Sequence, residues 1–327
     1  MKKIKKYSVK SVIYIVSALF FISLLLHYAI TVYLPSKNVR PDKADGGTLA
    51  ELIFFYVGQG DAAAVLTDAG VMLIDTGPNS SERALAGSLK ALGIDRIDLL
   101  FLSHTDEDHA GGCDEILRNF DVGSVYLPPE GHSGTVYDSL MTEARLHGVP
   151  VCDSAGGDGY LMGDVSVRVL SPYYPLPDDV NEASLILLLG IGNINCLFCG
   201  DAGVYAEELL LSRFLMYPEN EKNADGGNPA VGENNISYNG SRGLLPRCDL
   251  MKIGHHGSSG SSSQKFIEAF APRIAVISCG RGNSFGHPHA TVTERLKAIG
   301  CEIFRTDLNG DLRFYTDGKS IYPEKNQ

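Results

Sequence analysis

The stretch "SHTDEDHAGG", residues 103–112, places two histidines and three acidic residues within six consecutive positions. It follows residues 99–102, an apolar run typical of a strand that is covered on both faces. Unpaired carboxylates at the end of a buried strand cost on the order of several kcal/mol unless a cation neutralises them. We therefore interpret the stretch as a metal-binding loop, with a solvated acidic loop as the alternative. Gly111 and Gly112 permit close backbone approach before a helix expected from about Cys113.

Two further strand-like runs end in the same kinds of side chain. Asp201 follows the run "LFCG", and the adjacent His255 and His256 follow "LMKIG". Three strands thus end in carboxylate or imidazole groups. A two-metal site needs about this set of donors, with one carboxylate bridging the ions.

The remaining patterning predicts an α/β fold. "ELIFFYV" is a strand candidate, and "AAAVL" and "VMLID" form a pair joined by a turn at residues 67–70. Leu85, Leu89 and Leu92 recur at helical spacing, and strands and helices then alternate. Continuous apolar runs such as "SLILLLGI" are typical of strands buried on both faces.

The N-terminus predicts a membrane anchor. Residues 1–10 contain five lysines, and residues 11–34 are apolar. As a helix, roughly two dozen residues reach about 36 Å, enough to cross a hydrocarbon core of about 30 Å. No A-x-A cleavage pattern follows, so we favour an uncleaved anchor over a cleaved signal peptide. The positive-inside rule then keeps residues 1–10 cytoplasmic and places the rest of the chain outside.

This layout predicts one large domain. We expect a polar linker at 35–47, a domain at 48–320 and a tail at 321–327, with an Asn-, Gly- and Glu-rich flexible insertion at 217–243. The net charge of −11 argues against a broad nonspecific nucleic-acid surface. A local basic groove or a bound metal would still serve an anionic substrate.

The seven cysteines are odd in number and lie mostly in apolar runs. Cys196 and Cys199 are three residues apart in a strand, so their side chains point to opposite faces. No second pair completes a four-thiolate zinc site. We interpret the cysteines as small buried hydrophobic residues, with a disulfide as the alternative.

Over residues 48–315 the chain resembles the metallo-β-lactamase superfamily. "LIDTG", "SHTDEDHAGG", "CGDAG" and "HHGS" occur in that superfamily's order. "VGQGDAAAV", "NEASLILLL", "LMKIGHHGS" and "GRGNSFGHPHATVTERLKAIG" resemble the C-terminal hydrolase-like domain of ComEC-type competence proteins. The resemblance implies an αββα four-layer sandwich, here preceded by the single membrane helix. It also implies a hydrolase that uses a metal-bound hydroxide.

The same resemblance implies a set of site residues. One divalent ion takes His104 and Asp106, the other takes Asp108, His109 and His255, and Asp201 bridges the two. His256 is the alternative to His255, because one sequence does not say which imidazole turns inward. Asp75 orients the ligand loop through hydrogen bonds, or else stabilises the turn before Gly77.

This sequence departs from the superfamily pattern at two points. Asp106 stands where many members have histidine, although ComEC-type proteins often have aspartate there. The histidine usual before the bridging aspartate is missing, and Asn181 and Ser184 occupy that region. More oxygen and less imidazole favours harder ions, so we expect Mn²⁺ or Mg²⁺ to compete with Zn²⁺.

The expected chemistry is phosphodiester hydrolysis, with DNA or another external phosphodiester as substrate. Asp108 and Asp201 are the expected catalytic residues, Asp108 as partner for the proton of the attacking water. Five side chains are candidates for contacting substrate phosphate, each with a purely structural alternative: Lys252, His256, Arg281, His287 and His289.

Two other classes stay open. One is hydrolysis of a lactam, lactone or thioester on the same fold, and the other is a non-catalytic metal-binding domain. A single candidate span does not support a DNA channel, and no protein partner can be inferred.

Overall fold

The computed structural model describes residues 48–129, 133–216 and 245–325. The expected anchor at 11–34, its flanks at 1–10 and 35–47, and the insertion at 217–243 lie outside these residues. Within them, no helix is both long enough and apolar enough to span a bilayer.

Two large sheets form the centre of the domain, and a two-stranded parallel pair adds β4 (Arg96–Ile97) and β6 (Asp121–Val122). In spatial order, the first sheet contains β17 (Ile321–Pro323), β16 (Leu312–Thr316), β1 (Ala50–Phe54), β2 (Ala63–Thr67), β3 (Gly70–Ile74), β5 (Leu99–Phe101), β7 (Val125–Leu127) and β8 (Val151–Asp153). The second contains β15 (Glu302–Arg305), β14 (Ile274–Ile277), β13 (Leu250–Lys252), β12 (Ile194–Phe198), β11 (Ile186–Ile191), β10 (Val165–Ser171) and β9 (Gly159–Met162).

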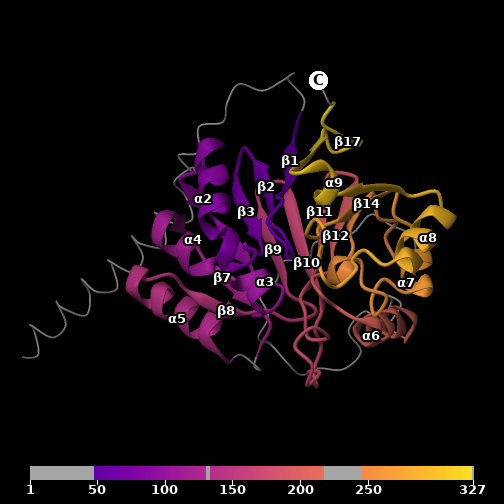
Figure 1. Cartoon of the computed structure of the whole chain (residues 1–327), viewed down its shortest axis with the longest axis horizontal. Coiled ribbons are helices and arrows are strands. Elements are labelled where there is room, and N and C mark those ends of the chain that lie inside the picture. Colours follow the sequence, from indigo (N-terminus) through magenta and orange to yellow (C-terminus); the bar gives the residue numbers. More distant parts are fainter. Residues whose placement is uncertain (1–47, 130–132, 217–244, 326–327) are drawn as a thin grey trace, which may run out of the picture. The chain divides into compact units, whose positions relative to one another are not determined.

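Helices cover the outer face of each sheet (Figure 1). The first sheet carries α2 (Glu82–Ala91), α4 (Cys113–Asn119) and α5 (Thr135–His147), and the second carries α6 (Val204–Met216), α7 (Gln264–Phe270) and α8 (Ala290–Ala298). Two short helices, α3 (Glu107–Ala110) and α9 (Thr306–Asn309), lie in loops. The order helix, sheet, sheet, helix confirms the predicted four-layer sandwich.

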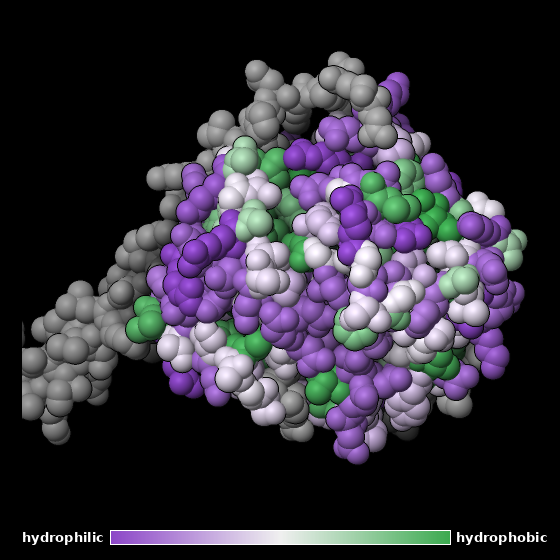
Figure 2. Space-filling view, viewed as in Figure 1, coloured by the Kyte–Doolittle hydropathy of each residue, from purple (hydrophilic) through white to green (hydrophobic). Residues whose placement is uncertain are grey.

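Strand periodicity explains why the sandwich holds together. In β1, Leu52 and Phe54 face the core between the sheets, whereas Ile53 faces the helices. In β11, Leu187 and Leu189 face that same core, and Leu188 packs under the other helices. Both faces of these strands are buried, as their continuous apolar runs predicted. On the face shown in Figure 2, the apolar residues form small patches among polar ones.

Several local predictions are confirmed. β2 and β3 pair antiparallel across the predicted turn, and α2 buries Leu85 and Leu89. All seven cysteines are free, and only Cys152 is less than fully buried.

Two expectations were wrong in detail. The expected tail includes β17, which pairs with β16 and extends the sheet. The metal-binding loop expected at residues 103–112 contains one turn of helix, α3. Both elements are too short to produce a periodic signal.

The site lies where parallel strands end. β3 and β5 are parallel neighbours in the first sheet, and β12 and β13 are parallel neighbours in the second. The two sheets are tied at this edge because Leu185 N donates to Ser103 O at 2.8 Å. The carboxyl ends of all four strands therefore deliver their loops to one place.

The loop 103–112 is clamped by close backbone contacts. Gly112 N donates to Gly77 O at 2.9 Å, and Thr76 N donates to His109 O at 2.6 Å. A Cβ at Gly112 would lie 2.5 Å from the carbonyl oxygen of Thr76. Only glycine fits there without movement of the backbone.

We expect Gly112→Ala to lower the free energy of unfolding by about 1–3 kcal/mol through this clash. Gly87→Ala is the matched control, since Gly87 lies in α2 and a Cβ there would have nothing within 4 Å; it should raise stability by about 0.5–1 kcal/mol. Urea unfolding of the full chain in detergent, followed by circular dichroism, measures both. Equal effects of the two substitutions would show that the loop is not tightly clamped.

Candidate metal centre

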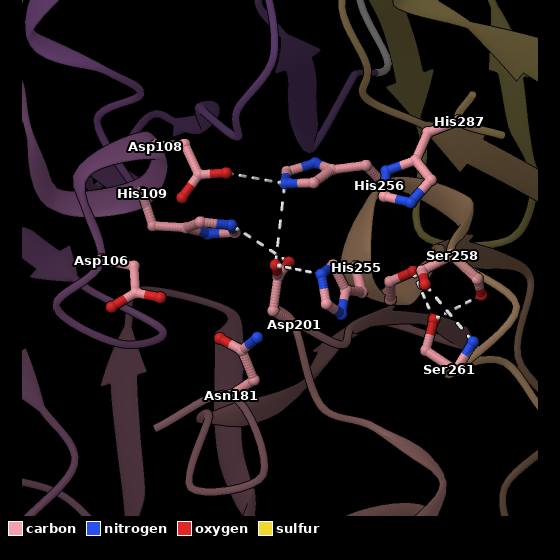
Figure 3. A network of polar contacts seen from close by, with 12 residues as sticks. Asp106, Asp108, His109, Asn181, Asp201, His255, His256, Ser258, Ser261 and His287 are labelled. Atoms are coloured by element: carbon pink, nitrogen blue, oxygen red, sulfur yellow. Dashed lines mark hydrogen bonds and ion pairs between the residues drawn. The ribbon is translucent and has the colours of Figure 1, made fainter. Parts of the chain in front are cut away.

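Three loops bring acidic and imidazole groups together at the strand ends. His104, Asp108 and His109 come from the loop after β5, Asp201 from the loop after β12, and His256 from the loop after β13. Figure 3 shows Asp201 in the middle, with the rings of His109, His255 and His256 directed toward it. Asp201 Oδ1 lies 3.0 Å from His109 Nε2, and Asp201 Oδ2 lies 3.7 Å from His256 Nε2.

Three buried histidines present the same ring nitrogen to the cluster. In each, Nδ1 makes a hydrogen bond away from the centre: His104 to Ser103 Oγ (3.0 Å), His109 to Asp75 Oδ2 (2.9 Å) and His256 to Ser278 O (3.1 Å). Since the Ser103 hydroxyl donates to Asp75, and the other two acceptors cannot donate, Nδ1 carries the proton in all three. Nε2 of each ring therefore faces the acidic groups of the cluster, and it is the nitrogen that would ligate a cation after losing any proton it carries.

Several of these atoms are buried without a hydrogen-bond partner. They are Asp61 Oδ1, His104 Nε2, His109 Nε2 and Asp201 Oδ1, and the contacts that Asp61 and Asp201 make with His256 and His109 are ion pairs rather than hydrogen bonds. Buried polar atoms are normally satisfied, so a group of such atoms in one place is the arrangement expected of a cation-binding site. The donors form two sets whose atoms lie within 4.8 Å of one another, namely Asp61, His109, Asp201 and His256, and His104, Asp108 and His109. This buried cluster is able to bind metal ions.

The electrostatics suit a cation. Burial opposes ionisation of Asp201, but His109 and His256 outweigh it and hold the pKa of the carboxyl well below its usual range. Burial and the neighbouring His109 lower the pKa of His104 to about 3, so this imidazole is neutral at pH 7. Burial opposes protonation of His109 and His256, but Asp201 outweighs it and raises both pKa values, that of His256 to about 9. Neutral imidazole and ionised carboxylate are the forms that ligate metals, so a cation would displace protons from these two rings.

The structure distinguishes the two adjacent histidines. His256 is 1% exposed and belongs to one of the donor sets, whereas the His255 side chain is 33% exposed, with Nε2 3.6 Å from Asp201 Oδ2. Both residues have left-handed backbones, with φ of 48° and 52°. Each such residue costs about 1–3 kcal/mol, a strain that commonly marks functional loops. Asp75 shares this conformation with φ of 59°.

Asp106 lies close to His104, and the chain neighbours of Asn181 line a pocket together with His104. The Asp106 side chain is 53% exposed, and its Oδ2 lies 3.8 Å from His104 Nε2. Asn181 Oδ1 is buried without a hydrogen-bond partner, and Figure 3 shows its amide on the same side as Asp201. Ser184 has a different role, because its Oγ accepts from the backbone N–H of Asp201 at 3.3 Å.

Asp61 is the cluster residue that sequence reasoning missed. It is 5% exposed, its Oδ1 lies 3.3 Å from His256 Nδ1, and its Oδ2 pairs with Lys252 Nζ. Burial opposes its ionisation, but Lys252 and His256 lower its pKa below the usual range. Its signal was the motif "VGQGDAAAV", in which a single aspartate shows no ligand spacing.

Lys252 was predicted to contact substrate phosphate, but its side chain points into the protein. Its side chain is 4% exposed, and Nζ donates to Ile253 O at 2.9 Å besides pairing with Asp61. Lys252 is the last residue of the buried strand β13, and its ammonium group points inward. In this position it neutralises Asp61 and is withheld from solvent.

The other predicted substrate residues differ in their surroundings. His287 borders the cluster, with its ring centroid 5.8 Å from that of His255. Burial, with the charge of His256, lowers the pKa of His287 to about 4. His289 Nδ1 accepts from Ser259 N at 2.8 Å, which gives His289 a structural contact. Arg281 is exposed, and its Nε donates to Asp307 O at 3.0 Å.

The fold and the buried donor cluster agree with a family match. Residues 55–281 match the model of the metallo-beta-lactamase superfamily, and the chain belongs to this superfamily. Among solved structures, the metallo-beta-lactamase fold protein YhfI from Bacillus subtilis aligns with a TM-score of 0.51 and 10% identity, over 82% of this chain and 100% of that one. CmlA, a diiron beta-hydroxylase from Streptomyces venezuelae, aligns with a TM-score of 0.51 and 13% identity, over 84% and 55%.

The curated relatives confirm the resemblance to ComEC-type competence proteins. ComE operon protein 3 of Bacillus subtilis is 29% identical, covering 84% of this chain and 34% of that protein. Competence protein ComA of Neisseria gonorrhoeae is 31% identical, over 85% and 34%. Recombination protein 2 of Haemophilus influenzae is 27% identical, over 81% and 29%. The chain spans about a third of the length of these relatives.

The adjacent histidines provide a matched pair of variants. Because His256 lies inside the donor cluster, we expect His256→Ala to weaken Mn²⁺ and Zn²⁺ binding by more than about 100-fold, and His255→Ala by less than about tenfold. Isothermal titration calorimetry on the metal-stripped full chain measures both affinities. Circular dichroism controls for folding. The reverse order of effects would assign the ligand to His255.

Proposed function

We propose that this protein is a metal-dependent phosphodiesterase, with DNA as its first candidate substrate. The observation that carries the proposal is the group of buried, unpartnered imidazole and carboxylate atoms at the shared sheet edge. These donors fit two divalent cations better than one, because the two sets share His109 but are otherwise distinct. Mn²⁺ or Zn²⁺ are the proposed ions, with Mg²⁺ as the alternative.

Bound ions at this site would polarise phosphate oxygens and make a water molecule more acidic. The protein's own groups complete the reaction. Asp108 is buried on one side by His256, with Oδ2 3.1 Å from His256 Nε2, but 34% of its side chain is exposed. It can therefore both ligate an ion and accept a proton from water that enters from solvent. Asp201, at the centre, is the proposed bridging ligand. His287 and Arg281 remain the candidates for contacting substrate.

Oxygen donors favour phosphodiester hydrolysis over opening of a lactam, lactone or thioester. Asp106 Oδ2 lies 3.8 Å from His104 Nε2, and Asn181 offers a buried amide oxygen that has no hydrogen-bond partner. A harder, more oxygen-rich site suits ions that bind phosphate. Solvent access at Asp108 supports catalysis over a purely structural metal site.

The proposal of DNA rests on the names of the relatives, one of which is called a competence protein and another a recombination protein. We also propose that residues 11–34 anchor the chain in the cell membrane, with the domain outside. This proposal is supported by the five lysines of residues 1–10 and the apolar run that follows them.

The activity is tested on the full chain in detergent, stripped of metal and then supplied with Mn²⁺, Mg²⁺ or Zn²⁺. We expect hydrolysis of bis-p-nitrophenyl phosphate and of single-stranded DNA to return with metal. Asp201→Ala should lower kcat/KM by about 100-fold or more. Asp164→Ala, an exposed aspartate in the turn between β9 and β10, is the control and should be unchanged. Tight metal binding without turnover would contradict the proposed phosphodiesterase activity. Turnover of bis-p-nitrophenyl phosphate alone would exclude DNA as the substrate.

A second prediction concerns the oxygen donor Asn181. If its orphaned Oδ1 serves the ion beside His104, then Asn181→Ala should weaken one of two metal-binding steps by about tenfold and leave the other unchanged. Calorimetric titration of the metal-stripped chain resolves the two steps. Asn193→Ala, in the exposed turn between β11 and β12, is the control. Two unchanged steps would exclude Asn181 from the metal environment.

A further inference from the structure

A pocket opens directly beside the metal cluster. It has a volume of about 380 Å³, within the usual size range of small-molecule sites. His104 lines it, as do Val180 and Ala183, which lie on either side of Asn181 in the chain. The walls come from the end of β7 and from the loop between β10 and β11. A group bound here is therefore attached to, or adjacent to, the atoms held at His104.

The walls of this pocket are apolar and rigid. Two buried prolines follow β7, and the opposite loop supplies a tyrosine, a leucine and two more prolines: Pro128, Pro129, Tyr174, Pro175, Leu176 and Pro177. Proline rings hold their shape because φ is fixed, so little entropy is lost when a ligand packs against them. The Tyr174 side chain is 58% exposed, which leaves its ring available for a further contact. Such walls suit a flat ring.

The charge of the pocket excludes a second phosphate. Among its lining residues that the structure describes, there is no lysine or arginine, and Asp178 supplies a carboxylate. Asp106, whose Oδ2 lies 3.8 Å from His104 Nε2, adds a second carboxylate near the residue that this pocket shares with the cluster. A phosphate in this pocket would meet these carboxylates without a compensating cation. An uncharged ring with N–H groups would instead find an acceptor in Asp178.

We propose that this pocket binds an uncharged, flat ring carried by one arm of the scissile phosphodiester. The substrate class is thus a phosphodiester with an aromatic or nucleobase-like substituent next to the phosphate. The inference rests on the proposed function, and it makes Tyr174 and Leu176 specificity-determining residues for the site.

Three p-nitrophenyl phosphodiesters test this inference, since they share one leaving group and differ in the second arm. The second arm is methyl, p-nitrophenyl or 5′-thymidyl. We expect Tyr174→Ala to lower kcat/KM by about tenfold for esters whose ring occupies the pocket, chiefly through KM. Leu176→Ala should act in the same direction. Tyr174→Phe keeps the ring and should stay within about twofold of the wild type.

Tyr205→Ala is the matched control, because Tyr205 is a similarly exposed tyrosine that lies on α6 and does not line the pocket. A loss confined to the two esters with a second ring places that arm in the pocket. An equal loss for all three places the leaving group there. Either result supports the inference, and comparison of the p-nitrophenyl with the thymidyl ester distinguishes a simple aryl group from a nucleoside.

Unchanged kcat/KM for all three esters in Tyr174→Ala and Leu176→Ala would overturn the inference while leaving the phosphodiesterase intact. The absence of turnover in the metal-loaded wild type would instead overturn the proposed function, and the inference with it. Circular dichroism and metal content of each variant show that a loss of activity does not come from misfolding.

Discussion

The Asp75 carboxylate accepts three hydrogen bonds that join two parallel strands and aim one of the imidazoles. Ser103 donates through its backbone N–H at 2.7 Å and its hydroxyl at 2.9 Å, and His109 donates through Nδ1 at 2.9 Å. Burial raises the pKa of Asp75, and the charge of His109 opposes that rise. Because Ser103 also accepts from His104, the orientation of two cluster histidines depends on this carboxylate. The buried carboxylate of Asp75 is thus satisfied by donors from the neighbouring loop, and the same hydrogen bonds fix the orientation of the imidazoles in the cluster.

Charge compensation determines much of what surrounds the centre. Asp61 and Asp201 are both buried, and Lys252, His109 and His256 lie against them. Burial of ions is expensive unless the partners are held in good geometry. Backbone strain adds to this cost, since Asp75, His255 and His256 all have left-handed conformations. The clamped loop 103–112 and the tied sheet edge keep these strained residues in position.

The two sides of the centre differ in chemistry, which has consequences for the substrate. On the side of His104, the walls are proline-rich and the charged groups are acidic. On the side of His255, His287 stacks with the exposed Phe285, at 5.6 Å between ring centroids. A substrate held between them meets rigid apolar walls on the one side and imidazole on the other. Under the proposed function, this asymmetry would orient a phosphodiester whose two arms differ.

Local patterns in the sequence predicted an α/β fold and most of the cluster, and the resemblance to the metallo-β-lactamase superfamily implied the sandwich. Runs buried on both faces predicted the central strands, and residues 104–109, Asp201 and the His255–His256 pair stood at strand ends where parallel strands converge. Only the tertiary structure showed that His256 is buried within a set of donors while the His255 side chain is one-third exposed, since both residues follow the same strand and both have left-handed backbones. It also brought in Asp61, turned Lys252 away from solvent and assembled the pocket beside His104. Those features depend on contacts between residues far apart in the chain, which no local spacing records.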